Sequence, residues 1–390
     1  MNEWREVTLG DVLTLQRGFD ITRKQQRPGS VPVISSSGIG SYHDEPRAQG
    51  PGVVIGRKGS LGTVFFIDQP FWPHDTTLWV KDFKGNDPFF CHLLLKTLSL
   101  AELDAGSSNP TLNRNHAHLL AVRVPRVRLQ RRISAVLASF DDLIEINARR
   151  IALLEDLARS LYREWFVRFR FPGHDGTAVR DSLPDGWTMK RVGDIAEINR
   201  STVKAGDLPD PIRYVDISSI SPRRIEDTQL LAADEAPGRA RRRLSDGDTV
   251  WAMVRPNRRA HAIVHAPPAN LIASTGLAIL SPIAVPGSFL FEFSSTPEFT
   301  DYLVGRATGS AYPAVRPDDF REASIPIPPR ELLSAFDAIV DPTLRLTSSL
   351  MDANRALARA RELLRPRLVT GRLDISDVDL GGLIVDKNAK

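Results

Sequence analysis

Arginine clusters are the residues of this chain whose type and spacing best suit chemistry with a ligand. The sequence holds 51 lysines and arginines, of which only nine are lysine. Arginine carries a planar fork of donors that matches phosphates and guanine edges. A GC-rich genome also encodes arginine throughout, so the total by itself decides little. Three local clusters are more informative and favour contact with nucleic acid: RVRLQRR (126–132), RARRR (239–243) and RPNRR (255–259).

Motifs for catalysis are not recognisable in the sequence. The turn GRKGS departs from a P-loop because glycine follows Lys58. Asp75, Asp82 and Lys84 loosely resemble a D…DxK nuclease site, but such triplets arise by chance. The eight histidines show no metal-binding spacing. No glycine-rich strand, turn and helix for S-adenosylmethionine is visible. These absences favour a recognition protein over an enzyme.

The remaining composition narrows the class of protein further. The chain has 390 residues, a net charge of +4 and 42% hydrophobic residues, which suits two or three packed domains. Cys91 is the single cysteine, so an internal disulfide and a multi-cysteine zinc site are excluded, and we expect it in a core. No charged-then-apolar leader and no apolar run near ~18 residues is present. We therefore expect the protein to be located in the cytoplasm.

A long internal repeat organises the chain. Trp4, Gly10 and Asp11 recur 183 residues later as Trp187, Gly193 and Asp194. Later the offset is 203, and it relates three further pairs: Gly106/Gly309, Pro110/Pro313 and Pro125/Pro328. About twenty extra residues must therefore lie in loops of the second copy. Each copy mixes short strands with a few helices, so the predicted class is α+β, with two diverged copies of one domain. The repeated glycines and prolines would mark the joint between each domain and the helix after it.

A sustained heptad pattern follows the first copy. Its apolar positions alternate in steps of 4 and 3, with one asparagine among them: Ile133, Leu137, Phe140, Ile144, Asn147, Ile151, Leu154, Ala158, Leu161 and Trp165. This spacing is typical of a coiled coil, in which a single asparagine tends to fix register or partner. Residues 129–167 would form a helix of roughly 58 Å.

A second seam follows the second copy. Its positions are Phe336, Ile339, Thr343, Leu346, Leu350, Ala353, Leu357, Ala360 and Leu364. Pro342 should kink or restart this helix, with Asp341 as a possible N-cap. Neither helix can bury its seam alone, so we expect the two to pair as an antiparallel coiled coil. The alternative is that each helix packs on its own domain.

Several segments resemble one protein family when they are taken in order. The first copy contributes VPVISSSGIGSYHDE (31–45), GPGVVIGRKGSLGTVFF (50–66) and PFWPHDTTLWV (70–80). The second contributes YVDISSI (214–220), SDGDTVWAMVRP (245–256) and ASTGLAILSP (273–282). With LARSLYREWFVRF (157–169), this order resembles the specificity (S) subunit of type I restriction-modification systems. One departure is that the second helix lacks the tryptophan-rich end of the first.

The resemblance implies a domain plan and a division of labour. Two target recognition domains would each read one half of a bipartite DNA site, and two helices would set the half-site spacing. The subunit itself would be non-catalytic. It would dock methyltransferase subunits, typically two, which restriction (translocase) subunits then join. S-adenosylmethionine, ATP and Mg²⁺ would belong to those partners, and this chain would need no cofactor or metal.

The predicted boundaries follow from the repeat and the seams. They are target recognition domain 1 at 1–127, spacer helix 1 at 128–170, a linker at 171–185, target recognition domain 2 at 186–329, spacer helix 2 at 330–368 and a tail at 369–390.

Basic turns are the predicted DNA contacts, because they occupy matching places in both copies. In the first domain the candidates are Arg23, Lys24, Arg27, Arg57, Lys58 and Ser60. In the second they are Arg241, Arg242, Arg243, Arg255, Asn257, Arg258 and Arg259. Two other functions stay open. The chain could be the non-catalytic part of another DNA methyltransferase or nuclease system, or a coiled-coil adaptor that binds proteins.

Overall fold

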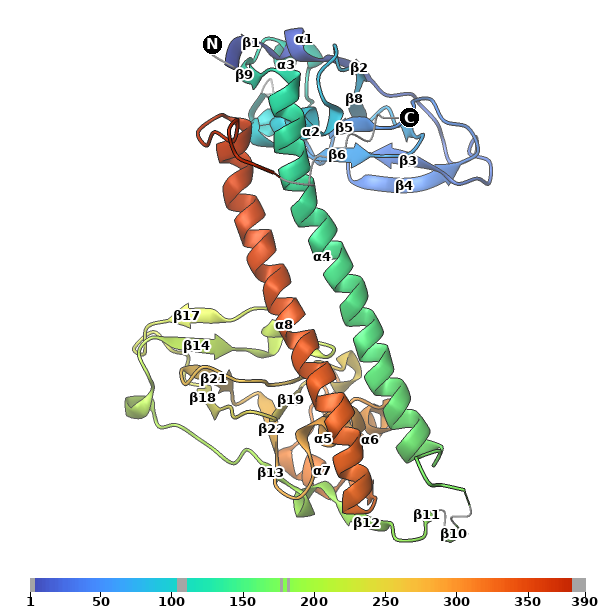
Figure 1. Cartoon of the computed structure of the whole chain (residues 1–390), viewed down its shortest axis with the longest axis vertical. Helices are drawn as coiled ribbons and strands as arrows, with labels where there is room; N and C mark the ends of the chain where they lie inside the picture. Colours follow the sequence, from blue (N-terminus) through green and yellow to red (C-terminus); the bar gives the residue numbers. More distant parts are fainter. Residues whose placement is uncertain (1–3, 104–110, 176–177, 181–182, 381–390) are drawn as a thin grey trace. The chain divides into compact units, whose positions relative to one another are not determined.

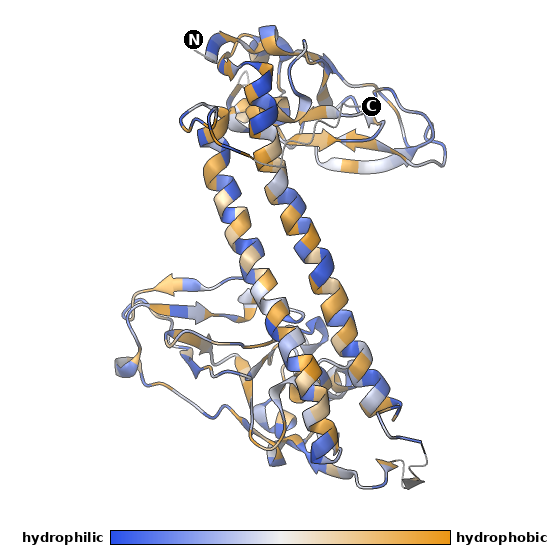
Figure 2. Ribbon diagram, viewed as in Figure 1, coloured by the Kyte–Doolittle hydropathy of each residue, from blue (hydrophilic) through white to orange (hydrophobic). Residues whose placement is uncertain are grey.

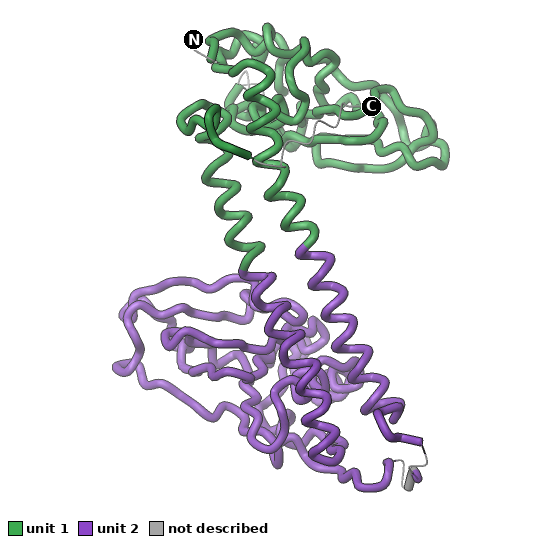
Figure 3. The backbone as a smooth tube through the Cα atoms, in the orientation of Figure 1, with its two compact units in different colours: residues 1–146, 353–390 green, residues 147–352 purple. Residues whose placement is uncertain are grey.

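Two compact units make up the chain in the computed structural model (Figure 3). Unit 1 comprises Met1–Ile146 with Ala353–Lys390, and unit 2 comprises Asn147–Asp352. The structure describes residues 4–103, 111–175, 178–180 and 183–380. Among these, no helix has the length and apolar character needed to span a bilayer.

The described part of unit 1 contains short strands, three short helices and parts of two long ones, which can be followed in Figure 1. Its strands are β1 (Trp4–Thr8), β2 (Thr14–Arg17), β3 (Val31–Ser35), β4 (Gly38–His43), β5 (Gly52–Gly56), β6 (Val64–Ile67), β7 (Trp72–Pro73), β8 (Thr77–Asp82) and β9 (Ala121–Pro125). Its helices are α1 (Leu9–Val12), α2 (Pro88–Thr97) and α3 (Arg114–His118), with a 3₁₀ turn at Leu100–Leu103.

Unit 2 holds the second set of strands and helices. The strands are β10 (Val179–Arg180), β11 (Leu183–Pro184), β12 (Thr188–Arg191), β13 (Ala196–Ile198), β14 (Ile212–Val215), β15 (Ile220–Ser221), β16 (Arg224–Ile225), β17 (Gln229–Leu231), β18 (Ala240–Arg243), β19 (Thr249–Ala252), β20 (His261–Ile263), β21 (Leu271–Ser274), β22 (Leu277–Pro282) and β23 (Ser324–Ile327). The helices are α5 (Gly287–Ser294), α6 (Pro297–Arg306) and α7 (Pro317–Glu322), and 3₁₀ turns lie at Val192–Asp194, Ala205–Asp207, Ile217–Ser219 and Pro256–Arg258.

The sheets confirm the predicted repeat. Unit 1 has a sheet of order β2-β8-β5-β6, and unit 2 has the matching order β13-β22-β19-β20. A two-stranded pair, β1-β9 or β12-β23, accompanies each sheet. In both units a further strand pairs in parallel, β7 with β3 and β21 with β14. The first matching strands, β3 and β14, start 181 residues apart, while β5 and β19 start 197 apart. Most of the extra residues therefore lie between β14 and β19, where β15 and β16 form a hairpin.

The repeated Gly-Asp dipeptide has the same local role in both units. The Asp11 carboxylate accepts the Thr8 backbone N–H at 3.0 Å, and Asp194 accepts that of Arg191 at 2.9 Å. Each acid thereby satisfies a donor at the start of a helical turn. A Cβ added to Gly10 would lie 3.2 Å from the Cβ of His118, and one added to Gly193 would lie 3.3 Å from that of Arg321. Glycine thus permits close approach of α3 or α7.

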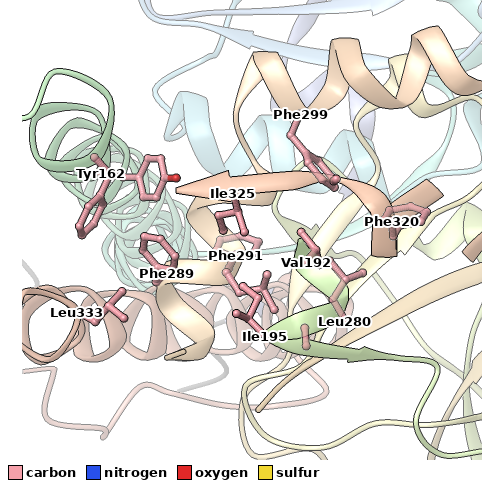
Figure 4. Close-up of a cluster of buried hydrophobic side chains, with 14 of the residues drawn as sticks. Tyr162, Val192, Ile195, Leu280, Phe289, Phe291, Phe299, Phe320, Ile325 and Leu333 are labelled. Carbon is pink, nitrogen blue, oxygen red and sulfur yellow. The ribbon is translucent and has the colours of Figure 1, made fainter. Parts of the chain in front are cut away.

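Each unit has its own apolar core. In unit 2, side chains from the sheet and from α5, α6 and α7 meet residues of the long helices. Phe289 of α5, Phe320 of α7 and Leu333 of the second long helix belong to this core (Figure 4). In unit 1, Cys91 lies fully buried on α2 among the sheet residues, as expected. The α+β class of the two domains is therefore confirmed.

The first long helix matches its predicted seam. Helix α4 spans Val127–Tyr162 and continues as a π-helical turn over Arg163–Val167, close to the predicted 129–167. Every predicted seam residue is buried or half-buried, from Ile133 to Trp165. Hydrophobic and hydrophilic residues alternate along the helix (Figure 2).

The second long helix differs from the prediction in two ways. Helix α8 runs unbroken over Arg330–Val369, so a restart of the helix at Pro342 is wrong. Pro342 is exposed, which leaves the carbonyl that loses its partner open to water. Asp341 does not cap a new helix, because its carboxylate instead accepts from Arg345 at 2.7 Å.

Burial along the first part of α8 is also displaced from the predicted seam. Ile339 and Leu346 are 44% and 41% exposed. Phe336 and Leu350 of the predicted seam are buried, and the other buried positions lie outside that seam: Leu333, Val340, Leu344 and Thr347. This stripe follows the 3.6-residue helical period, because here α8 packs on the domain core of unit 2 as well as on α4. The alternative of packing on its own domain is therefore correct for this stretch.

Within each unit, segments of the two long helices lie together. In unit 1 the Asn354 side-chain amide donates to the Ile144 carbonyl at 3.2 Å, and Arg361 pairs with Asp141. Residue numbers therefore rise along α4 in the direction in which they fall along the adjacent part of α8. This confirms the predicted antiparallel pairing within unit 1. In unit 2 the Phe336 ring lies 4.8 Å from that of Phe166.

The exit from each domain also follows the repeat. Pro125 ends β9 just before α4, and Pro328 follows β23 just before α8. Gly309 adopts a φ of +101°, which only glycine tolerates easily. In the first copy, Gly106 and Pro110 are the counterparts of Gly309 and Pro313, and both lie outside the described residues.

Candidate nucleic-acid interface

The two basic turns occupy equivalent places in the two units. One connects β5 to β6, and the other connects β19 to β20. The Arg57 backbone donates to the Thr76 carbonyl at 2.9 Å, just before β8. Met253 likewise donates to the Gly276 carbonyl at 3.1 Å, just before β22. The matching position of the two turns, predicted from the repeat, is therefore confirmed.

Arg57 leads the first turn. It is half-buried, and its Nη1 is buried without a hydrogen-bond partner among the described residues. Burial, with the nearby Arg17, lowers the pKa of the Arg57 guanidinium from its usual value. A buried donor without a partner is a place where a ligand atom or water would gain binding energy. Lys58 is half-buried, Ser60 is exposed, and the Ser60 carbonyl accepts the Thr63 hydroxyl at 2.9 Å.

The second turn is tightly wound. Arg255 and Arg259 both have a φ of 54°, which lies in the left-handed region that residues other than glycine rarely adopt. Strain of this kind gathers at functional sites. Arg255 lies over the Tyr312 ring. The Arg259 guanidinium instead donates to the Ser295 carbonyl, so it is already used within unit 2. Asn257 and Arg258 are exposed between them.

The loop between β2 and β3 carries three further candidates. Arg23 and Lys24 are exposed there. Arg27 donates to Asp44 at 2.6 Å and pairs with Glu45 at 2.8 Å. Its donors therefore face carboxylates rather than solvent alone.

The arginines of β18 lie in a different sheet from the second turn, with order β17-β14-β21-β18. Arg241 donates to the Ala240 carbonyl at 2.7 Å, and Arg242 donates to the Thr202 hydroxyl at 2.7 Å. Burial lowers the pKa of Arg242 from its usual value. Arg243 is exposed and reaches the Asp207 carbonyl at 3.5 Å. These side chains therefore also hold β18 against residues 201–207.

The acidic residues weighed as a nuclease site have other partners. Asp75 pairs with Arg17 at 2.9 Å, while Asp82 accepts the Lys84 backbone N–H at 2.8 Å. Asp20, His74 and Asp75 come close enough together to surround a cation, but Arg17 already balances the charge of Asp75. The geometry therefore indicates a salt-bridged cluster.

Two stacked side chains were not predicted from the sequence. The Arg47 guanidinium lies 4.9 Å from the Trp72 ring centre in unit 1. Tyr312, under Arg255 in unit 2, is 69% exposed. Neither belongs to an arginine cluster, and the partners of each pair are far apart in sequence, so a search for local clusters passes over them.

The helix α4 carries a second apolar stripe beside its seam. Leu143, Ile146, Leu153 and Leu157 follow helical spacing and are 47–72% exposed. Exposed large apolar side chains gathered on one face of a helix are typical of a protein-binding surface.

The sequence of this chain is similar to those of known proteins. Residues 1–156 match the family model described as "Type I restriction modification DNA specificity domain". The type I restriction enzyme MjaIX specificity subunit of Methanocaldococcus jannaschii is 23% identical, over 84% of this chain and 78% of that protein. The HindI specificity subunit of Haemophilus influenzae is 21% identical, over 96% of this chain and all of that protein.

A solved structure agrees with the fold. The crystal structure of a type I restriction-modification system S subunit from M. genitalium has a TM-score of 0.65 and 15% identity, over 95% of this chain and 96% of that chain. The chain is therefore similar to type I restriction-modification specificity subunits, and its residues 1–156 match the model of a DNA specificity domain of such systems.

Proposed function

We propose that this chain is the non-catalytic DNA-reading subunit of a type I restriction-modification complex. Each of its two α+β domains reads one half of a bipartite DNA site. The observation that carries this proposal is the pair of basic turns. They have the same backbone neighbours in both units but different side chains, Arg57 and Lys58 against Arg255, Asn257 and Arg258. Two domains that share a backbone arrangement in this turn but differ in its side chains are suited to recognise two different DNA sequences.

The predicted contacts divide by chemistry. Exposed cations such as Arg23, Lys24 and Arg258 suit phosphates, which position the protein. Arginines held by neighbouring groups suit base edges, because a fixed fork loses little freedom on binding.

The long helices serve two further roles in this proposal. Their length sets the spacing between the half-sites. The exposed stripe at Leu143, Ile146, Leu153 and Leu157 docks a helical face of a methyltransferase subunit. The repeat supports two such subunits, since two similar domains offer two similar faces, and restriction (translocase) subunits then join them.

Catalysis belongs to the partners in this scheme. S-adenosylmethionine would be held by the methyltransferase subunits, and ATP and Mg²⁺ by the assembly that cleaves DNA. A role on chromosomal DNA would place the complex in the cytoplasm.

Methylome sequencing tests this function. The chain is co-expressed with the methyltransferase encoded beside it in a host without other modification systems. We expect methylation at one bipartite motif with a fixed gap, and none when either protein is omitted. A continuous motif would favour another kind of methyltransferase system. Absence of both methylation and DNA binding by the complex would favour the protein-binding adaptor.

A further inference from the structure

Arg47 lies in the connection between β4 and β5 of unit 1. Its backbone N–H donates to the Phe71 carbonyl at 3.0 Å, and that of Ala48 donates to the same carbonyl at 3.0 Å. Phe71 in turn donates to the Ala48 carbonyl at 2.9 Å. The backbone from which the Arg47 side chain extends is therefore held against the segment that leads into β7.

The Arg47 side chain rests on fixed aromatic rings. Its guanidinium carbon lies 4.9 Å from the Trp72 ring centre and 5.9 Å from that of Phe19. Trp72 is 5% exposed, and its indole N–H donates to the Phe19 carbonyl at 3.2 Å. The His43 ring meets Trp72 edge-on at 5.2 Å. A guanidinium that lies over such rings has less freedom to rotate than one surrounded by solvent.

Other arginines nearby are already neutralised. Asp75 pairs with Arg17 at 2.9 Å, and Asp44 and Glu45 pair with Arg27 at 2.6 and 2.8 Å. In the part of the chain that the structure describes, the Arg47 side chain makes neither an ion pair nor a hydrogen bond. Its planar fork of donors is therefore available to a ligand.

The depression beside Arg47 carries both signs of charge. Asp20 and Glu45 line it together with Arg27, Arg47 and Trp72. The two carboxylates balance the two arginines of this lining, so the depression has no excess positive charge to attract a phosphate. The edge of a base is neutral and presents donors and acceptors in the major groove, so it does not need such a charge.

We infer that Arg47 determines specificity in the first domain by donating two hydrogen bonds to O6 and N7 of a guanine in one half-site. This inference rests on the DNA-reading function proposed above. Bidentate contact of arginine with guanine loses less freedom when the fork is already restrained, and the two rings under Arg47 restrain it before DNA binds.

Substitution of Arg47, read out by methylome sequencing of the complex, tests the inference. Arg47→Ala removes the fork, and Arg47→Lys keeps the charge without it. We expect both variants to accept other bases at one guanine of one half-site. The loss of discrimination should lie between about 5- and 150-fold, the range of one bidentate base contact. The other half-site should be read as before, which also shows that the complex has folded and assembled.

Arg17→Ala is the matched control, since Arg17 is a nearby arginine of the same domain whose fork is already paired with Asp75 at 2.9 Å. We expect this variant to keep the motif. An unchanged motif in both Arg47 variants would overturn the inference. So would a phosphate contact, in which Arg47→Ala weakens all sequences equally and Arg47→Lys behaves as wild type. Failure of the DNA-reading function is distinct, because the wild-type complex would then show no bipartite motif.

Discussion

The Arg255 guanidinium lies 4.6 Å from the centre of the Tyr312 ring and donates to the Ala311 carbonyl at 3.2 Å. The Arg255 backbone N–H also donates to the Pro313 carbonyl, at 2.7 Å. Residues 311–313 thus hold Arg255, in the β19–β20 turn, through three contacts. Arg47 is stacked in a comparable way in unit 1, but on a different connection, so each unit presents a pre-oriented arginine from its own position.

Arg255→Ala should weaken binding of the assembled complex to its DNA site by about 1–3 kcal/mol, since one positioned base or phosphate contact is lost. The slope of log K against log salt should also fall by about 1 if Arg255 contacts a phosphate. Fluorescence anisotropy over a salt series measures both. Tyr312→Phe keeps the ring and should bind as wild type. Wild-type affinity and slope in Arg255→Ala would remove this residue from the interface.

Shortening both long helices should change the gap between the half-sites. Deletion of residues 140–146 from α4 with residues 354–360 from α8 removes about 10 Å from each helix, or about three base pairs. The two deleted segments adjoin within unit 1, where Asn354 donates to Ile144, so their joint removal should leave the remaining parts of the two helices paired. Methylome sequencing should then show the same half-sites with a shorter gap. An unchanged gap would contradict the proposed role of the helices in spacing.

Leu153→Asp should prevent docking of the methyltransferase subunit. Leu153 is 72% exposed on the second apolar stripe of α4, so the substitution should spare folding but place a charge in a dry interface. Co-purification should fall by at least about tenfold, since an unpaired buried charge costs several kcal/mol. Ala152→Asp adds the same charge to an exposed position on a different face and serves as the control. Equal recovery of partner with both variants would exclude this stripe.

The buried pair of Arg223 and Glu292 should govern the stability of unit 2. The two side chains are 7% and 1% exposed, and Arg223 also lies 4.6 Å over the Phe291 ring. Arg223→Met leaves the Glu292 carboxylate buried without a counter-ion, which should cost about 3–5 kcal/mol in urea unfolding. Glu292→Gln added to this variant should recover part of that loss. Arg224→Met is the control, because Arg224 is 41% exposed and 3.9 Å from Glu155. Equal effects of the two single variants would contradict a role for burial.

Stability should also fall between pH 7 and pH 5 because of buried histidine. Burial lowers the pKa of His261 to about 3, and its ring stacks on Trp251 at 4.7 Å. The unfolded chain takes up this proton near pH ~6.5 and the folded chain does not. Unfolding therefore gains protons in this range, and the free energy of unfolding decreases as pH falls.

The expected loss is about 2 kcal/mol at pH 5 for one such histidine. Burial also lowers the pKa of His92 to about 3 in unit 1, so the comparison needs a His261 variant. Urea unfolding of His261→Gln at both pH values should show a decrease smaller by about that amount. The same decrease in variant and wild type would rule out His261 as its source.

The sequence alone determined the features that depend on local spacing. The heptad steps from Ile133 to Trp165 correctly placed α4 and its buried side, because a helical period is set within a few turns. The offset of 183 between Gly10-Asp11 and Gly193-Asp194 correctly indicated two copies of one domain, since the same cap and the same close approach recur. The matched basic turns followed from that repeat.

Only the tertiary structure decided which side chains are buried on α8 and which arginines can reach a ligand. Pro342 does not break α8, because it faces solvent while Val340 and Leu344 pack in the core of unit 2. Arg27 is neutralised by acids about seventeen residues away, while Arg47 is held by Trp72 and Phe19. Local composition cannot distinguish these two arginines, because charge pairing and stacking depend on contacts that form only when distant segments of the chain meet.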